Sequence, residues 1–293
     1  MKILLIDYDA GTTSLGGDTH AYDMAREWKK NGGKTLIVTA DYSYLRQKNP
    51  EKTHIGQIDE QEGISFLWIQ SPVATDREKK ILRGALPFEK GLHRCFPLIA
   101  DWEPDVVLLS SRHLLGSHGA AKVAKRLRIP LIFDVRRVYP EHLQEVLEYA
   151  PSHFLVQVFS QTQKAMYRKS RKVLSIYPKL GEHMAVLRAD PQKFVPVPQV
   201  LAPSFWKEHP FPQRHIDFVR RYQEKGNFIC LAGGEVEKDQ ELDLLIEAAA
   251  LEPRDVLFIL VGNGMYKPNL KREVKKRALS NVLFLDGVSP QQL

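Results

Sequence analysis

Three short apolar runs near the end of the chain alternate with two stretches of helical period. The runs are residues 228–232, 256–261 and 282–285. Uninterrupted apolar runs of this length are typical of buried parallel strands, whereas half-exposed strands alternate apolar and polar residues. The order strand, helix, strand, helix, strand predicts a doubly wound α/β unit. In such units, ligands bind beyond the carboxyl ends of the strands.

Glycine-containing turns follow two of these runs. Gly234 comes just after the first run, and Gly262, Asn263 and Gly264 follow the second. Glycine has no side chain, so backbone N–H groups in such turns can approach a ligand closely. A tight turn that binds nothing explains the same residues, and short motifs of this kind fit both interpretations.

The length of 293 residues exceeds what one typical hydrophobic core supports and predicts two domains. Hydrophobic residues make up 43% and charged residues 26% of the chain, as in soluble globular proteins. No apolar run is as long as a membrane span, and the apolar start of the chain is interrupted at Asp7, too early for a signal peptide. We therefore expect a cytoplasmic protein.

The formal net charge of +7 predicts an anionic partner, such as nucleotide phosphates, a membrane surface or nucleic acid. The chain has no zinc-finger spacing, RNA-recognition signature or heptad-supported basic region, so no motif supports nucleic-acid binding. Its two cysteines, Cys95 and Cys230, lie far apart in the sequence. They imply neither a disulfide framework nor a metal site.

The chain begins with another unit of the same kind. An apolar run at 3–6, a polar loop, a helix with one apolar stripe and a second run at 35–40 form a βαβ unit. Gly16 and Gly17 open the helix, where backbone N–H groups and the helix dipole can receive a phosphate. The third glycine of the dinucleotide fingerprint is missing, which disfavours a nicotinamide cofactor.

Two further strand ends carry basic side chains at the expected ligand-binding edge of the first sheet. The apolar runs 105–109 and 131–135 are predicted strands. His113 lies just past the first, and Arg136 directly follows the second. A lone histidine is more often structural than catalytic, but this position favours a role in the site.

The remaining segments are less regular. Residues 41–63 are polar and predict a loop, and 64–69 predict another strand. Residues 76–96 combine basic and apolar side chains, a pattern that fits both an anionic membrane surface and a surface helix pair packed on its own domain. The proline-containing stretch 201–226 marks the passage between the two halves.

A series of short segments occurs in an order that covers nearly the whole chain. After the glycine-bearing first loop come MAREW (24–28), GKTLIVT (33–39), SSRH (110–113), VRRVYP (135–140), RKVLSI (171–176), EHM (182–184), KFVPVP (193–198), LDLLIEAA (242–249) and LVGNG (260–264). In this order the chain resembles the family 4 retaining glycosyltransferases. The resemblance is closest to bacterial transferases that build N-acetylfucosamine-containing or related O-antigen and capsule units.

This resemblance implies the GT-B arrangement of two facing Rossmann-like, doubly wound α/β domains. We expect an acceptor-side domain at 1–200, a linker at 201–226 and part of a donor domain at 227–293. The implied reaction transfers a hexosyl or N-acetylhexosaminyl group from a nucleotide-sugar donor to a saccharide or lipid-linked acceptor, with retention, in cell-surface polysaccharide synthesis. No metal or other cofactor is implied. Independently of the resemblance, we expect the protein in the cytoplasm, where the basic stretch 76–96 fits a peripheral position at the inner face of the membrane as well as packing on its own domain.

The resemblance also assigns roles to individual residues. Backbone N–H groups of Gly16 and Gly17 would contact the diphosphate, His113 would contact the transferred sugar, and Arg136 would hold phosphate or acceptor oxygens. Unlike typical retaining glycosidases, such transferases need no flanking pair of carboxylates. The other donor-binding residues would be Gly234, Lys238, Gly262, Asn263 and Gly264, and the acceptor-side residues would be His20 and Arg112.

Three features depart from the family pattern. Glu235 and Gln240 stand where many relatives carry an arginine and a lysine, so a cationic clamp on the phosphates would depend on Lys238. Arg137 stands where an acidic residue often follows the arginine of the first domain. The family continues past the last predicted strand with a glutamate pair that binds the donor. This sequence ends at Leu293 without one, so we expect an incomplete donor domain.

Two other classes of protein share this plan. A truncated relative without transferase activity would act as a binding or assembly protein for an acceptor, a lipid surface or a partner subunit. A sugar-nucleotide epimerase has the same two domains, but the matching motifs are those of transferases. Fold alone does not separate these classes.

Overall fold

In the computed structural model, the chain forms two compact units, Met1–Gln199 and Val200–Leu293. Within the ranges that the structure describes, none of the helices combines the length and apolar character needed to cross a bilayer. These ranges are 1–43, 45–46, 48–51, 55–71, 77–111, 114, 116–146, 148–198, 211–252 and 255–288.

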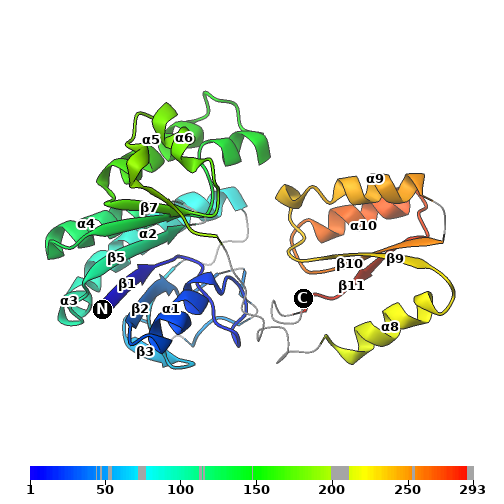
Figure 1. Ribbon diagram of the computed structural model, residues 1–293, viewed down its shortest axis with the longest axis horizontal. Coiled ribbons are helices and arrows are strands. Elements are labelled where there is room, and N and C mark those ends of the chain that lie inside the picture. Colours follow the sequence, from blue (N-terminus) through cyan, green and yellow to red (C-terminus); the bar gives the residue numbers. More distant parts are fainter. Residues whose placement is uncertain are drawn as a thin grey trace. The chain divides into compact units, whose positions relative to one another are not determined.

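In the described part of the first unit, eight strands form one sheet in the order β3-β4-β2-β1-β5-β6-β7-β8 (Figure 1). Neighbouring strands pair in parallel, except that β3 and β4 are antiparallel. Because most strands run the same way, their carboxyl ends meet at one edge of the sheet. The strands are β1 (Lys2–Ile6), β2 (Lys34–Ala40), β3 (Ile58–Gln61), β4 (Ile64–Ile69), β5 (Val106–Ser111), β6 (Leu131–Val135), β7 (Lys172–Ser175) and β8 (Phe194–Pro196).

Helices cover both faces of this sheet (Figure 1). Successive side chains of a strand point to opposite faces, so Ile3 and Leu5 pack with one hydrophobic cluster, whereas Leu4 and Ile6 pack with the other. Helix α1 (His20–Lys30) contributes to the first cluster, and α2 (Arg77–Arg94), α4 (Ser117–Leu127) and α5 (Phe154–Lys169) contribute to the second. The shorter elements are α3 (Phe96–Asp101), a π-helical turn (His142–Val146), α6 (Leu180–Val186) and a 3₁₀ turn (Pro191–Lys193).

Strand β3 lies inside the segment 41–63, which the sequence predicts as a loop; that prediction is wrong for Ile58–Gln61. Glu62 and Gly63 both have positive φ angles, 50° and 79°, and form the tight turn into β4. A two-residue turn of this kind joins antiparallel strands. The polar sequence of β3 suits its place at the edge of the sheet, where apolar strands invite aggregation.

Within the basic stretch 76–96, residues Arg77–Arg94 form one long helix, α2, which continues through Pro87, and Phe96 begins α3. Phe88 and Leu92 are fully buried and pack in the hydrophobic cluster on the α2 side of the sheet. By contrast, Leu86 is 67% exposed. The C-terminal half of α2 therefore packs on its own domain and leaves one large apolar side chain in contact with solvent.

The second unit contains the three strands predicted from the apolar runs. Among its described residues, β9 (Phe228–Gly233), β10 (Val256–Val261) and β11 (Val282–Leu285) form a parallel sheet in the order β11-β10-β9. Helices α9 (Asp243–Leu251) and α10 (Lys267–Lys276) cover one face, and α8 (Gln213–Gln223) covers the other (Figure 1). The expected doubly wound α/β fold is confirmed. Helix α8 lies within 201–226, the expected linker, and packs on this second sheet.

Candidate functional site

The loop between β1 and α1 folds back on itself at the carboxyl edge of the first sheet. Thr12 pairs with Gly16 and Ala10 with Asp18 through isolated bridges. Gly16 and Gly17 have φ angles of 71° and 85°, which residues with a Cβ rarely adopt. The Gly16 N–H donates to the Thr12 carbonyl at 3.0 Å, so it is engaged within the loop. The two glycines are therefore required by the conformation of the loop, whatever the loop binds.

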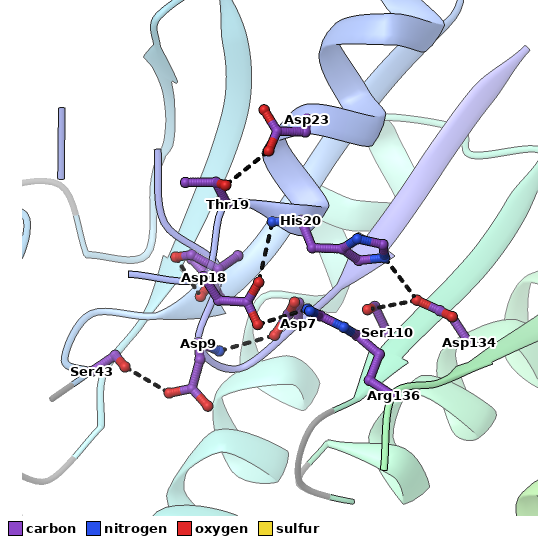
Figure 2. A network of polar contacts seen from close by, with 12 residues as sticks. Asp7, Asp9, Asp18, Thr19, His20, Asp23, Ser43, Ser110, Asp134 and Arg136 are labelled. Carbon is purple, nitrogen blue, oxygen red and sulfur yellow. Dashed lines mark hydrogen bonds and ion pairs between the residues drawn. The ribbon is translucent and has the colours of Figure 1, made fainter. Parts of the chain in front are cut away.

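Asp18 joins this loop to two other elements (Figure 2). Its Oδ1 accepts the backbone N–H of His20 at 3.1 Å, at the start of α1, and its Oδ2 accepts from Nη1 of Arg136 at 2.6 Å. Arg136 follows β6, so this ion pair spans 118 positions of the chain. The Asp18 side chain is 5% exposed and that of Arg136 is 20% exposed, which shields the pair from solvent.

A second carboxylate, Asp134 near the end of β6, holds the His20 ring. Its Oδ2 lies 3.1 Å from Nε2 of His20 and accepts from the Ser110 hydroxyl at 3.0 Å. Thr19 donates to Oδ2 of Asp23 at 2.8 Å, within the first turn of α1 (Figure 2). Two of the predicted site residues, His20 and Arg136, are thus brought together by Asp18 and Asp134.

Two more carboxyl groups are buried at the start of the same loop. Asp7 and Asp9 are each 2% exposed. Asp7 Oδ1 accepts the N–H of Asp9 at 3.1 Å, and Asp9 Oδ1 accepts from the Ser43 hydroxyl at 2.6 Å (Figure 2). Burial, followed by the negative charge of Asp18, raises the pKa of Asp7 to about 8. Asp7 is therefore mostly protonated at neutral pH.

Arg46, which sequence reasoning missed, fixes the other side of the loop. This guanidinium is 5% exposed and donates to the carbonyls of Ala10 and Ala40 and to the Thr39 hydroxyl, each at 2.8 Å. It also lies 5.2 Å from the centre of the Trp68 ring. Burial lowers the pKa of Arg46 to about 10, against the raising effect of Asp9. Arg46 sits in a polar segment that gives no local sign of such burial.

The segment after Arg136 is anchored by buried polar groups. The N–H of Tyr139 donates to Oε1 of Gln163 at 3.0 Å, and Gln163 in turn donates to the Tyr167 hydroxyl at 2.5 Å. Tyr139, Gln163 and Tyr167 are all within 1% of full burial. Arg137, the expected departure from the family pattern, lies with Nη1 3.1 Å from Nε2 of His142. The position of Arg136 is therefore set from both sides.

His113 and Arg112, predicted as catalytic and acceptor-side residues, lie outside the described residues. Strand β5, which leads to them, ends at Ser111, two residues later than the predicted strand 105–109.

In the second unit, two glycine turns pack backbone against backbone. A Cβ on Gly262 would lie 2.0 Å from the Gly234 carbonyl oxygen, and one on Gly264 would lie 2.1 Å from the Val236 carbonyl oxygen. Val236 N–H also donates to the Asn263 carbonyl at 3.0 Å. The structure brings Gly234 and the turn 262–264 into contact at the carboxyl ends of β9 and β10. It requires glycine at 262 and 264 because the neighbouring turn occupies the space of a side chain.

A lysine that the sequence did not single out holds this turn. Nζ of Lys267, at the start of α10, donates to the carbonyls of Gly262 at 2.6 Å and Leu285 at 2.7 Å. Partial burial, followed by the charge of Lys271, lowers the pKa of Lys267. Lys238, the predicted cation, begins a 3₁₀ turn (Lys238–Gln240) and is exposed. Lys267 thus places a cationic group at the carboxyl ends of β10 and β11.

Within the described part of the chain, no group of three or more His, Cys, Asp or Glu side chains is arranged to hold a metal ion. Asp9, Asp18 and Asp134 accept instead from hydroxyl, backbone and side-chain donors.

Known proteins resemble this chain in family and in fold. A family model described as a glycosyl transferase 4-like domain matches residues 16–199. No curated protein sequence matches the chain. Solved structures resemble the fold at low sequence identity. HepE from Anabaena, in complex with UDP and glucose, has a TM-score of 0.67 and 16% identity, covering 99% of this chain and 71% of HepE.

Two further structures extend this likeness. Sucrose-phosphate synthase from Thermosynechococcus elongatus has a TM-score of 0.72 and 12% identity, covering 99% of this chain and 72% of the synthase. WaaG, a glycosyltransferase involved in lipopolysaccharide biosynthesis, has a TM-score of 0.62 and 16% identity, covering 98% of this chain and 70% of WaaG. At sequence identities this low, the similarity to these structures shows a shared fold and nothing more.

Proposed function

The chain belongs to the glycosyl transferase 4-like family, and from this membership we propose that it transfers a sugar from a nucleotide-sugar donor to an acceptor, with retention at the anomeric carbon. The observation that carries the proposal lies within the matched residues 16–199. There, Asp18 connects the first loop to the start of α1 and to Arg136 at the strand end of β6. These elements are where a doubly wound sheet binds its ligands.

The chemical problem in such a transfer is the negative charge that develops on the diphosphate leaving group. Fixed N–H groups and cations near the phosphates stabilise that charge without reorganising. We assign this role to the N–H of Gly17 and to the guanidinium of Arg136. His20 is held by Asp134 on the acceptor side, and His113 is our candidate for contact with the transferred sugar.

We propose a UDP-sugar as the donor. HepE, which has the same fold, was solved with UDP-glucose. In this chain, the turn 262–264 and the N-terminus of α10 lie at the carboxyl ends of β10 and β11. We assign the nucleotide to this turn, which includes Asn263, and to the neighbouring Gly234. Lys238 is assigned as a cation that can approach the phosphates. We further propose that the transferred group is a hexosyl or N-acetylhexosaminyl group.

For the acceptor, we propose a saccharide or lipid-linked saccharide used in cell-surface polysaccharide synthesis. A cavity of about 640 Å³ beside α2 supports a lipid-linked acceptor, because exposed Lys90 and Arg94 line it together with the exposed Leu86. Basic and apolar groups side by side suit the interface of an anionic membrane. We therefore place the protein at the inner face of a membrane, in contact through 76–96.

The test uses water as the acceptor, since many transferases slowly hydrolyse their donor. The whole chain is incubated with a panel of UDP-hexoses and UDP-N-acetylhexosamines of α configuration, and proton NMR follows the sugar that is released. We expect UDP release and the α anomer as the first product. First appearance of the β anomer would contradict retention, and absence of turnover across the panel would contradict the assigned donor class.

A set of variants locates that activity. His113→Ala and Arg136→Met should lower turnover by at least about tenfold, the loss expected when one charge-stabilising contact is removed. The exposed Arg171→Met serves as the matched control and should leave turnover unchanged. Equal turnover in all three variants would remove His113 and Arg136 from the site.

A further inference from the structure

The Asp7 carboxyl at the carboxyl end of β1 is in an unusual position for an acidic group. It is 2% exposed, and its Oδ1 accepts one hydrogen bond, from the N–H of Asp9. Its Oδ2 is buried and has no hydrogen-bond partner among the described residues. An ionised carboxylate with a single N–H donor is strongly disfavoured in such a place, whereas a neutral carboxyl is tolerated.

Charged groups from three segments of the first unit surround Asp7. Asp9 on its own loop and Asp18 before α1 disfavour its ionised form, while Arg136 after β6 favours it. The buried Arg46, in the loop after β2, is also within electrostatic reach of Asp7. Burial is the largest influence, and Asp18 is the next, so the pKa of Asp7 is raised to about 8. Within this group, Asp7 and Asp18 both interact with the guanidinium of Arg136, and the ion pair of Arg136 is with Asp18.

The ion pair between Arg136 and Asp18 has a distance of 2.6 Å. If Asp7 lost its proton, a second carboxylate would compete for the same guanidinium. Arg136 would then be drawn away from Asp18, which also accepts the N–H of His20 at the start of α1. The protonation of Asp7 therefore decides how the first loop, α1 and the end of β6 are held together.

We propose that Asp7 is a positioning residue of the sugar-transfer site, which in its neutral form keeps Arg136 on Asp18. Through Asp18, it fixes the first loop against the start of α1. Its relevance to sugar transfer rests on the proposed function, whereas the coupling between Asp7 and Arg136 does not. Asp7 itself is buried and acts through Arg136 and Asp18.

The test follows both groups directly in the whole chain by NMR. Aspartate carboxyl carbons are labelled with carbon-13 and arginine Nε with nitrogen-15, and pH is varied from well below to well above 8. We expect one aspartate carbon to titrate near pH 8 and to be absent from Asp7→Asn. The Nε–H signal of Arg136, assigned with Arg136→Lys, should move with the same midpoint in the unsubstituted chain and stay constant in Asp7→Asn.

A second variant keeps the test decisive if Asp7→Asn does not fold. Asp18→Asn removes the strongest neighbouring negative charge and releases Arg136 toward Asp7. The Asp7 midpoint should then fall by about one pH unit or more, as for a carboxyl that loses a like charge and gains a cation. An unchanged midpoint in Asp18→Asn, or no aspartate titrating above its ordinary range, would overturn the proposal. Neither readout uses nucleotide, so failure to bind UDP would affect only the proposed function.

Discussion

At the scale of single residues, the first unit holds several ionisable side chains out of solvent. Asp7, Asp9, Asp18 and Arg46 are each 7% exposed or less. Buried charges persist only where partners compensate for their lost hydration. Arg46 donates to four such partners, the carbonyls of Ala10 and Ala40, the Thr39 hydroxyl and Oδ1 of Asn49, and so joins the loop after β1 to the end of β2.

Arg46→Met should destabilise the first unit by about 3 kcal/mol or more, because it leaves buried carbonyl and hydroxyl groups without a donor. Urea unfolding followed by tryptophan fluorescence measures this change. The exposed Arg171→Met is the control and should change stability by no more than about 0.5 kcal/mol. Equal stability of the two variants would mean that the Arg46 contacts contribute nothing net.

Asp7 also makes stability depend on pH. Its pKa is raised from 3.8 to about 8 in the folded chain. Between those values, the folded state keeps a proton that the unfolded state has lost, so stability falls as pH rises. Stability of the unsubstituted chain relative to Asp7→Asn should therefore decrease by several kcal/mol, at roughly 1.4 kcal/mol per pH unit, across this window. A difference that stays constant with pH would contradict a protonated Asp7.

The residues that the sequence predicted lie at strand ends, whereas those that it did not predict depend on contacts with other segments. Gly262 and Arg136 follow strand ends, and strand ends are visible as the end of an apolar run. Arg46 and Lys267 act through backbone carbonyls that belong to other segments. The raised pKa of Asp7 likewise arises from burial and from Asp18 and Arg136, which only the folded chain brings close. Such environments leave no local pattern in the sequence.

At the scale of elements, the candidate binding residues of each unit depend on the fit of turns at the carboxyl ends of strands. In the second unit, the turns at 234–236 and 262–264 are in backbone contact. Apolar runs predicted the strands that lead to these turns, since buried parallel strands are continuous in sequence. They did not predict β3, because an edge strand of polar residues resembles a loop.

Gly264→Ala should disturb this contact, because the new Cβ would lie 2.1 Å from the Val236 carbonyl oxygen. Gly226→Ala is a matched control in the same unit, where a Cβ meets nothing within 4 Å and only the φ of +83° is unfavourable. We expect the control to cost about 1 kcal/mol and Gly264→Ala to cost clearly more. Hydrogen exchange of β9 and β10 measures both, and equal protection in the two variants would argue against a tight contact.

Helix α2 carries the prediction about membranes. Lys90→Glu with Arg94→Glu should reduce sedimentation with anionic vesicles at low salt, since each basic residue near such a surface contributes about 1 kcal/mol. Arg168→Glu with Lys169→Glu, exposed on α5, changes the total charge equally and should bind as the unsubstituted chain does. Equal loss in both double variants would indicate an effect of net charge alone. No sedimentation of the unsubstituted chain would exclude the membrane surface as a partner.

At the scale of the whole molecule, the chain is two doubly wound units, each with glycine turns at the carboxyl edge of its sheet. The succession of strands and helices predicted this architecture, because buried strands appear in the sequence as continuous apolar runs and helices as apolar residues of helical period. Family membership adds sugar transfer, which the fold alone does not determine. The central claim of the proposed function is that the donor is a UDP-sugar.

Calorimetric titration of UDP into the whole chain tests that claim most directly. We expect saturable binding of UDP and much weaker binding of uridine, because N–H groups and cations at helix and strand ends recognise phosphate. Arg136→Met should weaken the binding of UDP more than that of uridine. Absence of any heat of binding with UDP at millimolar concentration would contradict the account of this chain as a UDP-sugar-dependent transferase.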